Sequence, residues 1–400
     1  MTIKVACAAA LSMTLLAACS ALNGIFPVAS TPTPTASPTA SSTPTLPPTE
    51  TPTPTPTPLP SATPVYPAAG LGPGGFPADV NPLTGLQVAN PTLLERRPLA
   101  IKVSNLPRSV RPQWGLSLAD IVFEYYTEEG ATRFIALFYG KDASMVGPIR
   151  SARFFDAHVV RGYKAVFAFG YAYEKVLDRL FSSDFADRLV VEGPYAPLTR
   201  YDPNGSNYLM ANTTTLSAYI TQKKVENGRK NLDGMFFQIQ PPAGGQPAPV
   251  VYARYSGAMY GRWDYDATTG KYLRYSETDN DLSRSNEKYA LLTDRLTNQP
   301  VVADNVVVLF VPQEYYVRPP GEVVDILFYG SGVAYAFRDG QGYQVKWQRN
   351  APEAVTSLTY LDGTPFPFKP GNTWFEVMGS NAQVQQQTDQ SWRFKYLLPQ

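Results

Sequence analysis

The sequence predicts an α+β fold in which an N-terminal mixed α/β layered domain (78–240) precedes a β-rich C-terminal domain (250–400). Three observations lead to this prediction. Strand-like runs alternate with helical runs up to about residue 225, which is the pattern of a layered α/β domain. After residue 250 nearly every apolar run is short and rich in β-branched and aromatic residues, as in strands. Between the two regions, 241–249 reads PPAGGQPAP and is typical of a linker.

The N-terminus has the layout of a secretory signal. Lys4 precedes an apolar run from Val5 to Leu16, which is too short to cross a bilayer as a helix. The run ends in Leu-Ala-Ala followed by Cys19, as in bacterial lipoproteins whose cysteine takes a diacylglyceryl group. We therefore expect residues 1–18 to be a lipoprotein signal peptide and Cys19 to be lipidated, since two chains with an N-acyl group anchor stably. An ordinary cleavage site that contains a cysteine is the alternative.

The segment after Cys19 has the composition of a stalk. Residues 20–77 consist mainly of Thr, Pro, Ala and Ser, with TPTPTPTP at the centre and Glu50 as the only charged side chain. Such a composition cannot bury a core, and proline favours an extended chain of about 3.1 Å per residue. We expect 19–77 to be a lipidated, disordered stalk on the extracytoplasmic face of the bacterial cell membrane.

Charge and cysteine content exclude several classes of function. The formal net charge is +1 at pH 7, so the sequence predicts no nucleic-acid partner and no membrane contact other than the lipid at Cys19. His158 is the only histidine, and Cys7 leaves with the signal peptide. With so few soft ligands, we expect no metal and no cofactor.

A hairpin is the clearest local structure. The runs 121–126 and 133–139 are rich in aromatic and β-branched residues, and a turn-like segment separates them. A turn centred between them places Glu124 opposite Arg133 or one diagonal away, so we expect a cross-strand ion pair.

The remaining elements follow from apolar periodicity and turn residues. In the N-terminal domain we expect strands at 99–103, 165–169 and 189–192 and helices at 151–160, 173–181 and 213–225. Ser151 is the expected N-cap of the first helix. In the C-terminal domain we expect strands at 250–255, 261–265, 272–275, 306–311, 323–329, 333–337, 345–348, 358–361 and 374–377.

Arginines near the start of the helix predicted from Ser151 form the first candidate site. Guanidinium groups and the free N–H groups of a helix start suit a phosphate, a carboxylate or a peptide C-terminus. The full candidate ligand-binding set is Arg111, Asp120, Glu124, Arg133, Arg150, Ser151 and Arg153. In the alternative interpretation these arginines only pair with nearby carboxylates, namely Asp120, Glu124 and Asp156.

Asp120 and Glu124 form the second candidate site. They lie four residues apart on one strand and so share a face, which suits acid–base work on a glycan. Their Cα atoms would lie roughly 13 Å apart, and a structural pair of Glu124 with Arg133 is the alternative. A nucleophile at Ser151 with His158 as base fails because about 10 Å of helix separates them. We therefore assign no catalytic residues.

Short motifs in and beyond the stretch 96–158 resemble a known family. They are Asn81-Pro82-Leu83-Thr84-Gly85, Arg97-Pro98, Asn105, Arg111-Pro112-Gln113, Gly115-Leu116, Ala119-Asp120, Glu124, Thr132-Arg133 and Gly147-Pro148-Ile149-Arg150-Ser151-Ala152-Arg153. With these motifs the sequence resembles the YerB-type lipoproteins, a two-domain family of unknown function. The resemblance implies a bacterial envelope lipoprotein without an established activity. After the strand at 165–169 the family tends to have a His-Gly-Gly-Ser-like turn, whereas this chain has Phe-Gly-Tyr-Ala.

Three functions remain open. The first is a non-enzymatic binding module that recognises a cell-wall component or an envelope protein through the arginines. The second is a wall glycan or peptide hydrolase that uses Asp120 and Glu124. The third is a solute-binding lipoprotein, which two domains would permit although a single linker crossing argues against the usual hinge.

Overall fold

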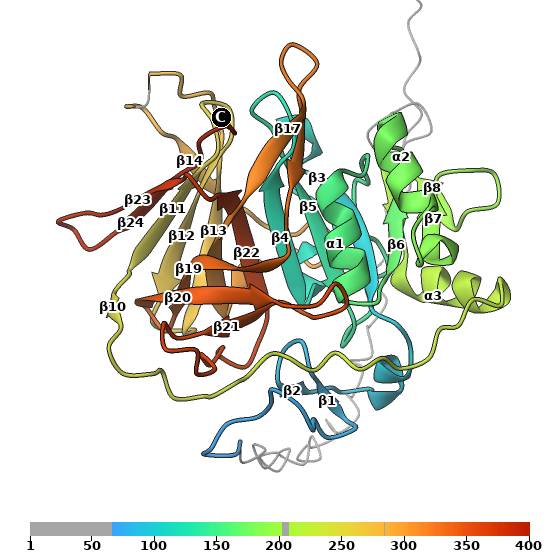
Figure 1. The fold of residues 1–400 in the computed structure, drawn as a ribbon, viewed down its shortest axis with the longest axis horizontal. Coiled ribbons are helices and arrows are strands. Elements are labelled where there is room, and N and C mark those ends of the chain that lie inside the picture. Colours follow the sequence, from blue (N-terminus) through green and yellow to red (C-terminus); the bar gives the residue numbers. More distant parts are fainter. Residues whose placement is uncertain (1–65, 202–207, 284) are drawn as a thin grey trace, which may run out of the picture. The chain divides into compact units, whose positions relative to one another are not determined.

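Two β-sheets dominate the computed structural model, which describes residues 66–201, 208–283 and 285–400. The predicted signal peptide, Cys19 and the stalk up to residue 65 lie outside the described residues. Figure 1 shows most strands of the C-terminal half gathered at one end of the folded body and the labelled α-helices toward the other.

The larger sheet has eleven strands and draws on both halves of the chain. From one edge to the other they are β10 (Gln246–Pro247), β20 (Gln341–Arg349), β19 (Gly330–Arg338), β16 (Asn305–Val311), β22 (Thr373–Gly379), β4 (Ile121–Tyr126), β5 (Thr132–Phe138), β3 (Leu99–Ser104), β6 (Val166–Phe169) and β7 (Leu189–Val191), with β21 (Ser357–Thr359) paired to β20.

The smaller sheet has seven strands, all from the C-terminal half. They are β14 (Tyr289–Leu291), β13 (Lys271–Glu277), β12 (Tyr260–Asp266), β11 (Val250–Arg254), β24 (Trp392–Lys395) and β23 (Gln383–Gln386), with β15 (Val302–Ala303) paired to β13. Three two-stranded ribbons complete the strands: β1 (Val80–Asn81) with β2 (Leu86–Gln87), β8 (Leu198–Arg200) with β9 (Leu209–Ala211), and β17 (Gln313–Val317) with β18 (Val323–Ile326).

The α-helices of the described residues are α1 (Phe154–Gly162), α2 (Glu174–Phe181) and α3 (Thr213–Gln222). The described chain is therefore mostly β, and the α+β prediction holds only in the sense that its helices all belong to the N-terminal half. In the part of the chain that the structure describes, no helix has the length and apolar character needed to cross a membrane.

The two halves of the chain meet within the large sheet. β22 runs parallel to β4, with Thr373 opposite Ile121 and Val377 opposite Tyr125. Every residue of β4 is buried, as expected of a strand covered on both faces. The strands β4, β5, β3, β6 and β7 of the N-terminal half therefore share one sheet with the C-terminal half, and β4, at the edge of this group, takes its other neighbour from that half. The predicted linker 241–249 also joins this sheet, since β10 pairs with β20.

Each face of the large sheet has its own cover. On one face Trp374 of β22 meets Trp263 of the small sheet, with ring centroids 5.2 Å apart. On the other face Phe123 of β4 packs against Phe155 of α1 at 5.9 Å. Because side chains alternate along a strand, neighbouring residues of β3, β4 and β5 enter two different environments.

The predicted hairpin is present, but its register differs from the expected one. Tyr125 lies opposite Arg133, and Glu124 lies opposite Phe134. A one-residue shift moves a side chain to the other face of a sheet. The expected ion pair between Glu124 and Arg133 is therefore wrong.

The end of the predicted stalk belongs to the folded body. Leu71 and Phe237 exchange two backbone hydrogen bonds of 2.8 Å, and Phe76 packs on the Phe237 ring at a centroid distance of 6.2 Å. The prediction of a stalk up to residue 77 is wrong for residues 66–77, because their few apolar side chains find partners far along the chain.

Candidate anion-binding site

Four cationic side chains gather where β3 and β6 end and α1 begins. They are Lys102, Arg133, Arg150 and Arg153, and they lie with the carboxylates of Glu128 and Asp156. We call these six residues the basic cluster. Ligands of open sheets commonly bind outside the carboxyl ends of the strands, so this position suits a binding site.

The backbone between β5 and α1 places two of these arginines. The Arg150 N–H donates to the Lys102 carbonyl at 3.0 Å, and the Ala152 N–H donates to the Tyr171 carbonyl at 2.7 Å. These bonds hold 150–152 extended, so α1 begins at Phe154 with Arg153 as its N-cap. The prediction of Ser151 as the N-cap is therefore wrong. The Ser151 carbonyl instead accepts a hydrogen bond of 2.8 Å from Arg133.

Glu128 pairs with two of the arginines and neutralises one of their two charges. Its carboxylate accepts from Arg133 at 2.9 Å and from Arg153 Nε at 2.6 Å. Although burial opposes it, the Arg153 hydrogen bond and the two guanidinium charges hold the pKa of Glu128 below its usual value. Burial, together with the charge of Arg153, lowers the pKa of Arg133 to about 10.

Lys102 and Asp156 form the buried floor of the basic cluster. Both side chains are fully buried, and Lys102 Nζ lies 3.2 Å from Asp156 Oδ1. The Tyr125 hydroxyl donates to the same carboxylate. Burial lowers the pKa of Lys102 to about 7, against the attraction of Asp156. Strongly shifted lysines are found at functional sites and also in structural pairs.

Arg150 differs from the other arginines of the cluster. Its Nε donates to Ser104 Oγ at 3.2 Å, and among the described residues no carboxylate lies within ion-pair distance of it. The segment after β6 lies beside Arg150, because the Gly170 N–H donates to the Arg150 carbonyl. Two exposed tyrosines, Tyr171 and Tyr173, follow in this segment. Even when Lys102 is neutral, the cluster holds three guanidinium groups and two carboxylates, so an excess of positive charge is available to an anion at Arg150.

Arg111 lies apart from the basic cluster. It pairs with Glu277 of β13 at 2.7 Å and donates to the Asn105 carbonyl at 3.0 Å. Asn105 is the residue after Ser104, and it faces the small sheet, where its amide contacts Glu124. The structure therefore brings together Arg133, Arg150 and Arg153 of the predicted site, but not Arg111.

Glu124 belongs to a closed cluster between the two sheets. Arg274 of β13 donates to Glu124 at 2.7 Å and to Glu376 of β22 at 2.8 Å, and all three side chains are buried. We call these three residues the inter-sheet cluster. Burial raises the pKa of Glu124 to about 8, because the charge of Glu376 adds to the effect and Arg274 offsets it only in part.

Asp120 has different partners again. Its Oδ2 accepts from the Tyr139 and Gly140 N–H groups at 2.6 and 2.9 Å. Because Glu124 is sealed between the sheets and Asp120 faces backbone, the two carboxylates do not form the acid–base pair that the sequence suggested.

Sequence reasoning did not identify Lys102 and Arg274 as members of these clusters. It also did not identify Glu128 as the partner of Arg133 and Arg153. Lys102 gave a usable signal, since it is a single charge inside the apolar run Leu99–Ser104. Arg274 gave none, because a strand with alternating charged and aromatic residues is equally typical of an exposed face. Among the described residues, no three His, Cys, Asp or Glu side chains are placed to hold a metal ion, and the expectation of no metal and no cofactor stays a prediction.

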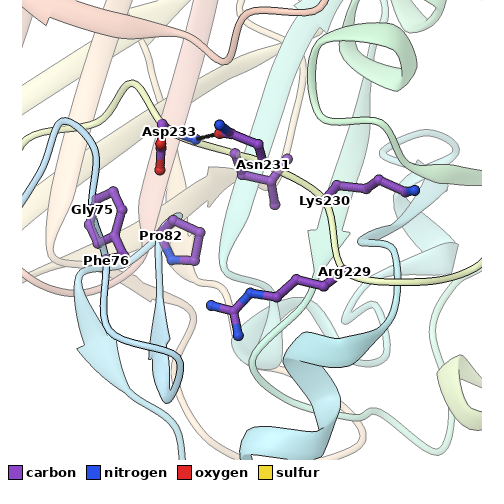
Figure 2. Close-up of a pocket in the computed structure, with 8 residues that line it drawn as sticks. Gly75, Phe76, Pro82, Arg229, Lys230, Asn231 and Asp233 are labelled. Carbon is purple, nitrogen blue, oxygen red and sulfur yellow. Dashed lines mark hydrogen bonds between the residues drawn. The ribbon is translucent and has the colours of Figure 1, made fainter.

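Another pocket, of about 380 Å³, lies where the chain enters the folded body. Figure 2 shows Arg229 and Pro82 at this pocket, with Lys230 extending away from Pro82. Arg229 donates to the Ala78 carbonyl at 2.6 Å and to Glu95 at 3.1 Å, while Lys230 pairs with Glu226. Its cations are therefore already neutralised, unlike Arg150.

Two family models match most of the folded body. They are described as the N-terminal and C-terminal domains of a protein of unknown function (DUF3048), and they match residues 83–226 and 251–375. A Bacillus subtilis (strain 168) protein named "Putative lipoprotein YerB" is 27% identical over 310 residues, which cover 74% of this chain and 85% of that protein.

A solved structure shares the architecture. The crystal structure of the YerB protein from Bacillus subtilis matches with a TM-score of 0.63 at 25% identity, over 75% of this chain and 96% of that one. The resemblance to YerB-type proteins is confirmed, and the chain belongs to the DUF3048 family, a two-domain family of unknown function.

Proposed function

We propose that this protein is a membrane-tethered, extracytoplasmic lipoprotein that acts as a non-enzymatic binding module. Its ligand is an anionic group on a cell-wall component, held at Arg150 in the basic cluster. The observation that carries the proposal is the excess of positive charge in the basic cluster, with Arg150 as its arginine without a carboxylate partner among the described residues.

Two further features support this ligand class. Arg133 and Arg153 are held rigidly by Glu128, so the field of the cluster is preorganised rather than created on binding. The exposed rings of Tyr171 and Tyr173 offer amphipathic surface to a sugar-containing polymer. The relative's printed name supports the lipoprotein part of the proposal.

Binding to cell walls tests the recognition. Full-length protein in detergent is mixed with wall sacculi that retain their anionic polymers and with sacculi from which these have been extracted. A charge-assisted hydrogen bond contributes about 1.5–3 kcal/mol, so Arg150→Gln should weaken retention about tenfold or more. Arg229→Gln, which removes an arginine paired with Glu95, should not. Equal retention of Arg150→Gln and the unmodified protein would reject the site.

The same experiment separates an envelope protein from a wall polymer. If the ligand is a wall polymer, the protein should not bind to extracted sacculi. Added salt should release it from the untreated sacculi. Retention that survives extraction but is lost after protease treatment of the sacculi would reject the wall component in favour of an envelope protein.

A fractionation experiment tests the tether. Cys19→Ala should move the protein from the membrane fraction to the medium or the soluble extracytoplasmic fraction, because the acyl chains supply the anchoring free energy. Persistence of Cys19→Ala in washed membranes would contradict lipid anchoring at this residue.

A further inference from the structure

A pocket separate from the one at Arg229 lies at the end of the large sheet opposite the basic cluster. Its volume is about 320 Å³, at the small end of the range of ligand pockets. The parallel strands β4, β16 and β22 all begin here. Asp120, Asp304 and Asn372, the residues that precede these strands, line it. We call it the amino-end pocket.

Segments from both halves of the chain build the amino-end pocket. Asn81 and Lys141 come from the N-terminal half, and Lys271 and Asp304 come from the C-terminal half. Two close approaches depend on glycine. A Cβ at Gly371 would overlap the Asp304 carboxylate, and a Cβ at Gly140 would lie 2.7 Å from Asn81 Nδ2.

The charges that line this pocket are only half paired. Lys271 lies 3.0 Å from Asp304. Among the described residues, neither Asp120 nor Lys141 has an ion-pair partner within 4.0 Å, although both line the same space. Burial raises the pKa of Asp120, against its bonds from the Gly140 and Tyr139 N–H groups and the charge of Lys141.

Asn81 lines the pocket beside Asp120. Its Oδ1 accepts from the Leu83 N–H at 3.0 Å, which fixes the orientation of the amide. The amide therefore points its Nδ2 group toward Asp120, and this contact helps to lower the pKa of Asp120 against the larger effect of burial.

We propose that the amino-end pocket binds the zwitterionic head group of an α-amino acid. Its ammonium lies against Asp120, and its carboxylate accepts from Lys141. A ligand with only one of these charges would leave the other side chain uncompensated, so the pocket favours a ligand that carries both. The apolar side chains of Leu86 and Val88 in the wall suit a short aliphatic substituent, and the volume limits the ligand to a small one.

Calorimetric titration of the full-length protein tests this proposal. The probes are alanine, acetate, ethylamine and Nε-acetyl-lysine, which carries the same head group on a longer chain. Saturable binding of alanine that is at least tenfold tighter than that of acetate or ethylamine is expected. Alanine should also bind more tightly than Nε-acetyl-lysine, because the pocket volume limits the length of the side chain; equal binding of the two would contradict that size limit. No saturable binding of alanine, or equal binding of acetate, would overturn the proposal.

Variants connect the binding to the pocket. Lys141 is exposed, so Lys141→Gln should fold normally and bind alanine at least tenfold more weakly, while Lys223→Gln, at another exposed lysine, should bind it unchanged. Asp120→Asn should also lose alanine, and Lys141→Gln alone decides the question if Asp120→Asn fails to fold. Unchanged affinity in Lys141→Gln would reject the site.

Arg150→Gln should bind alanine normally, which keeps this proposal separate from wall binding.

Discussion

The inter-sheet cluster and the basic cluster lie on opposite faces of the large sheet and differ in how their charges are paired. Glu124 and Tyr125 are neighbours on β4, yet Glu124 meets Arg274 between the sheets and Tyr125 meets Asp156 beneath α1. Between the sheets, Glu124 and Glu376 both accept from Arg274, and all three side chains are buried. At the strand ends, Arg150 is left without a carboxylate partner among the described residues.

The difference separates a structural role from a binding role. Charges enclosed by two sheets must be paired, because the desolvation of an unpaired ion costs several kcal/mol. The guanidinium groups of Arg133, Arg150 and Arg153 at the end of the sheet are partly exposed, so an excess of positive charge is tolerated there. An unpaired cation at a sheet end can therefore serve a ligand, whereas an unpaired cation between the sheets would prevent folding.

The strongest test breaks the inter-sheet cluster. Arg274→Met leaves Glu124 and Glu376 buried without their cation, and the free energy of unfolding should fall by about 3–5 kcal/mol. Urea denaturation measures the loss. Arg161→Met is the control, since its pair with Asp184 is largely exposed and should contribute less than about 1 kcal/mol. A similar small loss in both variants would show that the inter-sheet cluster is not sealed.

The pH dependence of stability tests the same cluster without removing the cation. The folded pKa of Glu124 is raised to about 8, so the folded protein binds a proton that the unfolded chain has lost, and this group's contribution falls as pH rises. The fall should amount to at most about 4 kcal/mol between pH 5 and pH 8. Glu124→Gln should flatten this part of the profile measured by urea denaturation, and the exposed-site control Glu353→Gln should not. An unchanged slope in Glu124→Gln contradicts the raised pKa.

Lys102 should produce the opposite slope from the other face of the sheet. Its folded pKa is lowered to about 7, so the unfolded chain binds the extra proton above pH 7 and stability rises with pH. The rise should be at most about 3 kcal/mol between pH 7 and pH 9. Denaturation profiles of Lys102→Met should lack this rise, while Lys346→Met, at an exposed lysine, should keep it. A rise that persists in Lys102→Met would assign it to another group.

Arg150 should matter least for folding. Arg150→Gln should lower the free energy of unfolding by only about 0.5–1 kcal/mol, because the side chain gives up a single hydrogen bond, to Ser104. Arg133→Gln should cost more, about 1–3 kcal/mol, since it leaves Glu128 and the Ser151 carbonyl short of a donor. Thermal or urea denaturation distinguishes them. A large loss in Arg150→Gln would make this arginine structural.

Local structure was largely predictable from the sequence. The hairpin of β4 and β5, helix α2 and most strands of the C-terminal half lie within a few residues of their expected positions, because apolar periodicity and turn residues are local signals. The register of the hairpin was not predictable to one residue. The Thr127 N–H donates to the Ala131 carbonyl and closes the turn, which places Tyr125 rather than Glu124 opposite Arg133.

Long-range pairing was beyond local signals. Nothing in the pattern of 121–126 indicates that its neighbour is β22, so the two predicted domains appeared separate. The same limit applies to the site. Arg133, Arg150 and Arg153 were expected together because they are close in sequence, whereas the partner of Arg111, Glu277, lies in another sheet.

The parallel pairing of β4 with β22 has a consequence for how the protein is made. A chain is made N-terminus first, so β4 is present long before the strand that will cover its edge. Until then an apolar strand keeps free backbone groups, the situation that promotes aggregation. A chain cut after the first family region should therefore accumulate as inclusions rather than as a working half.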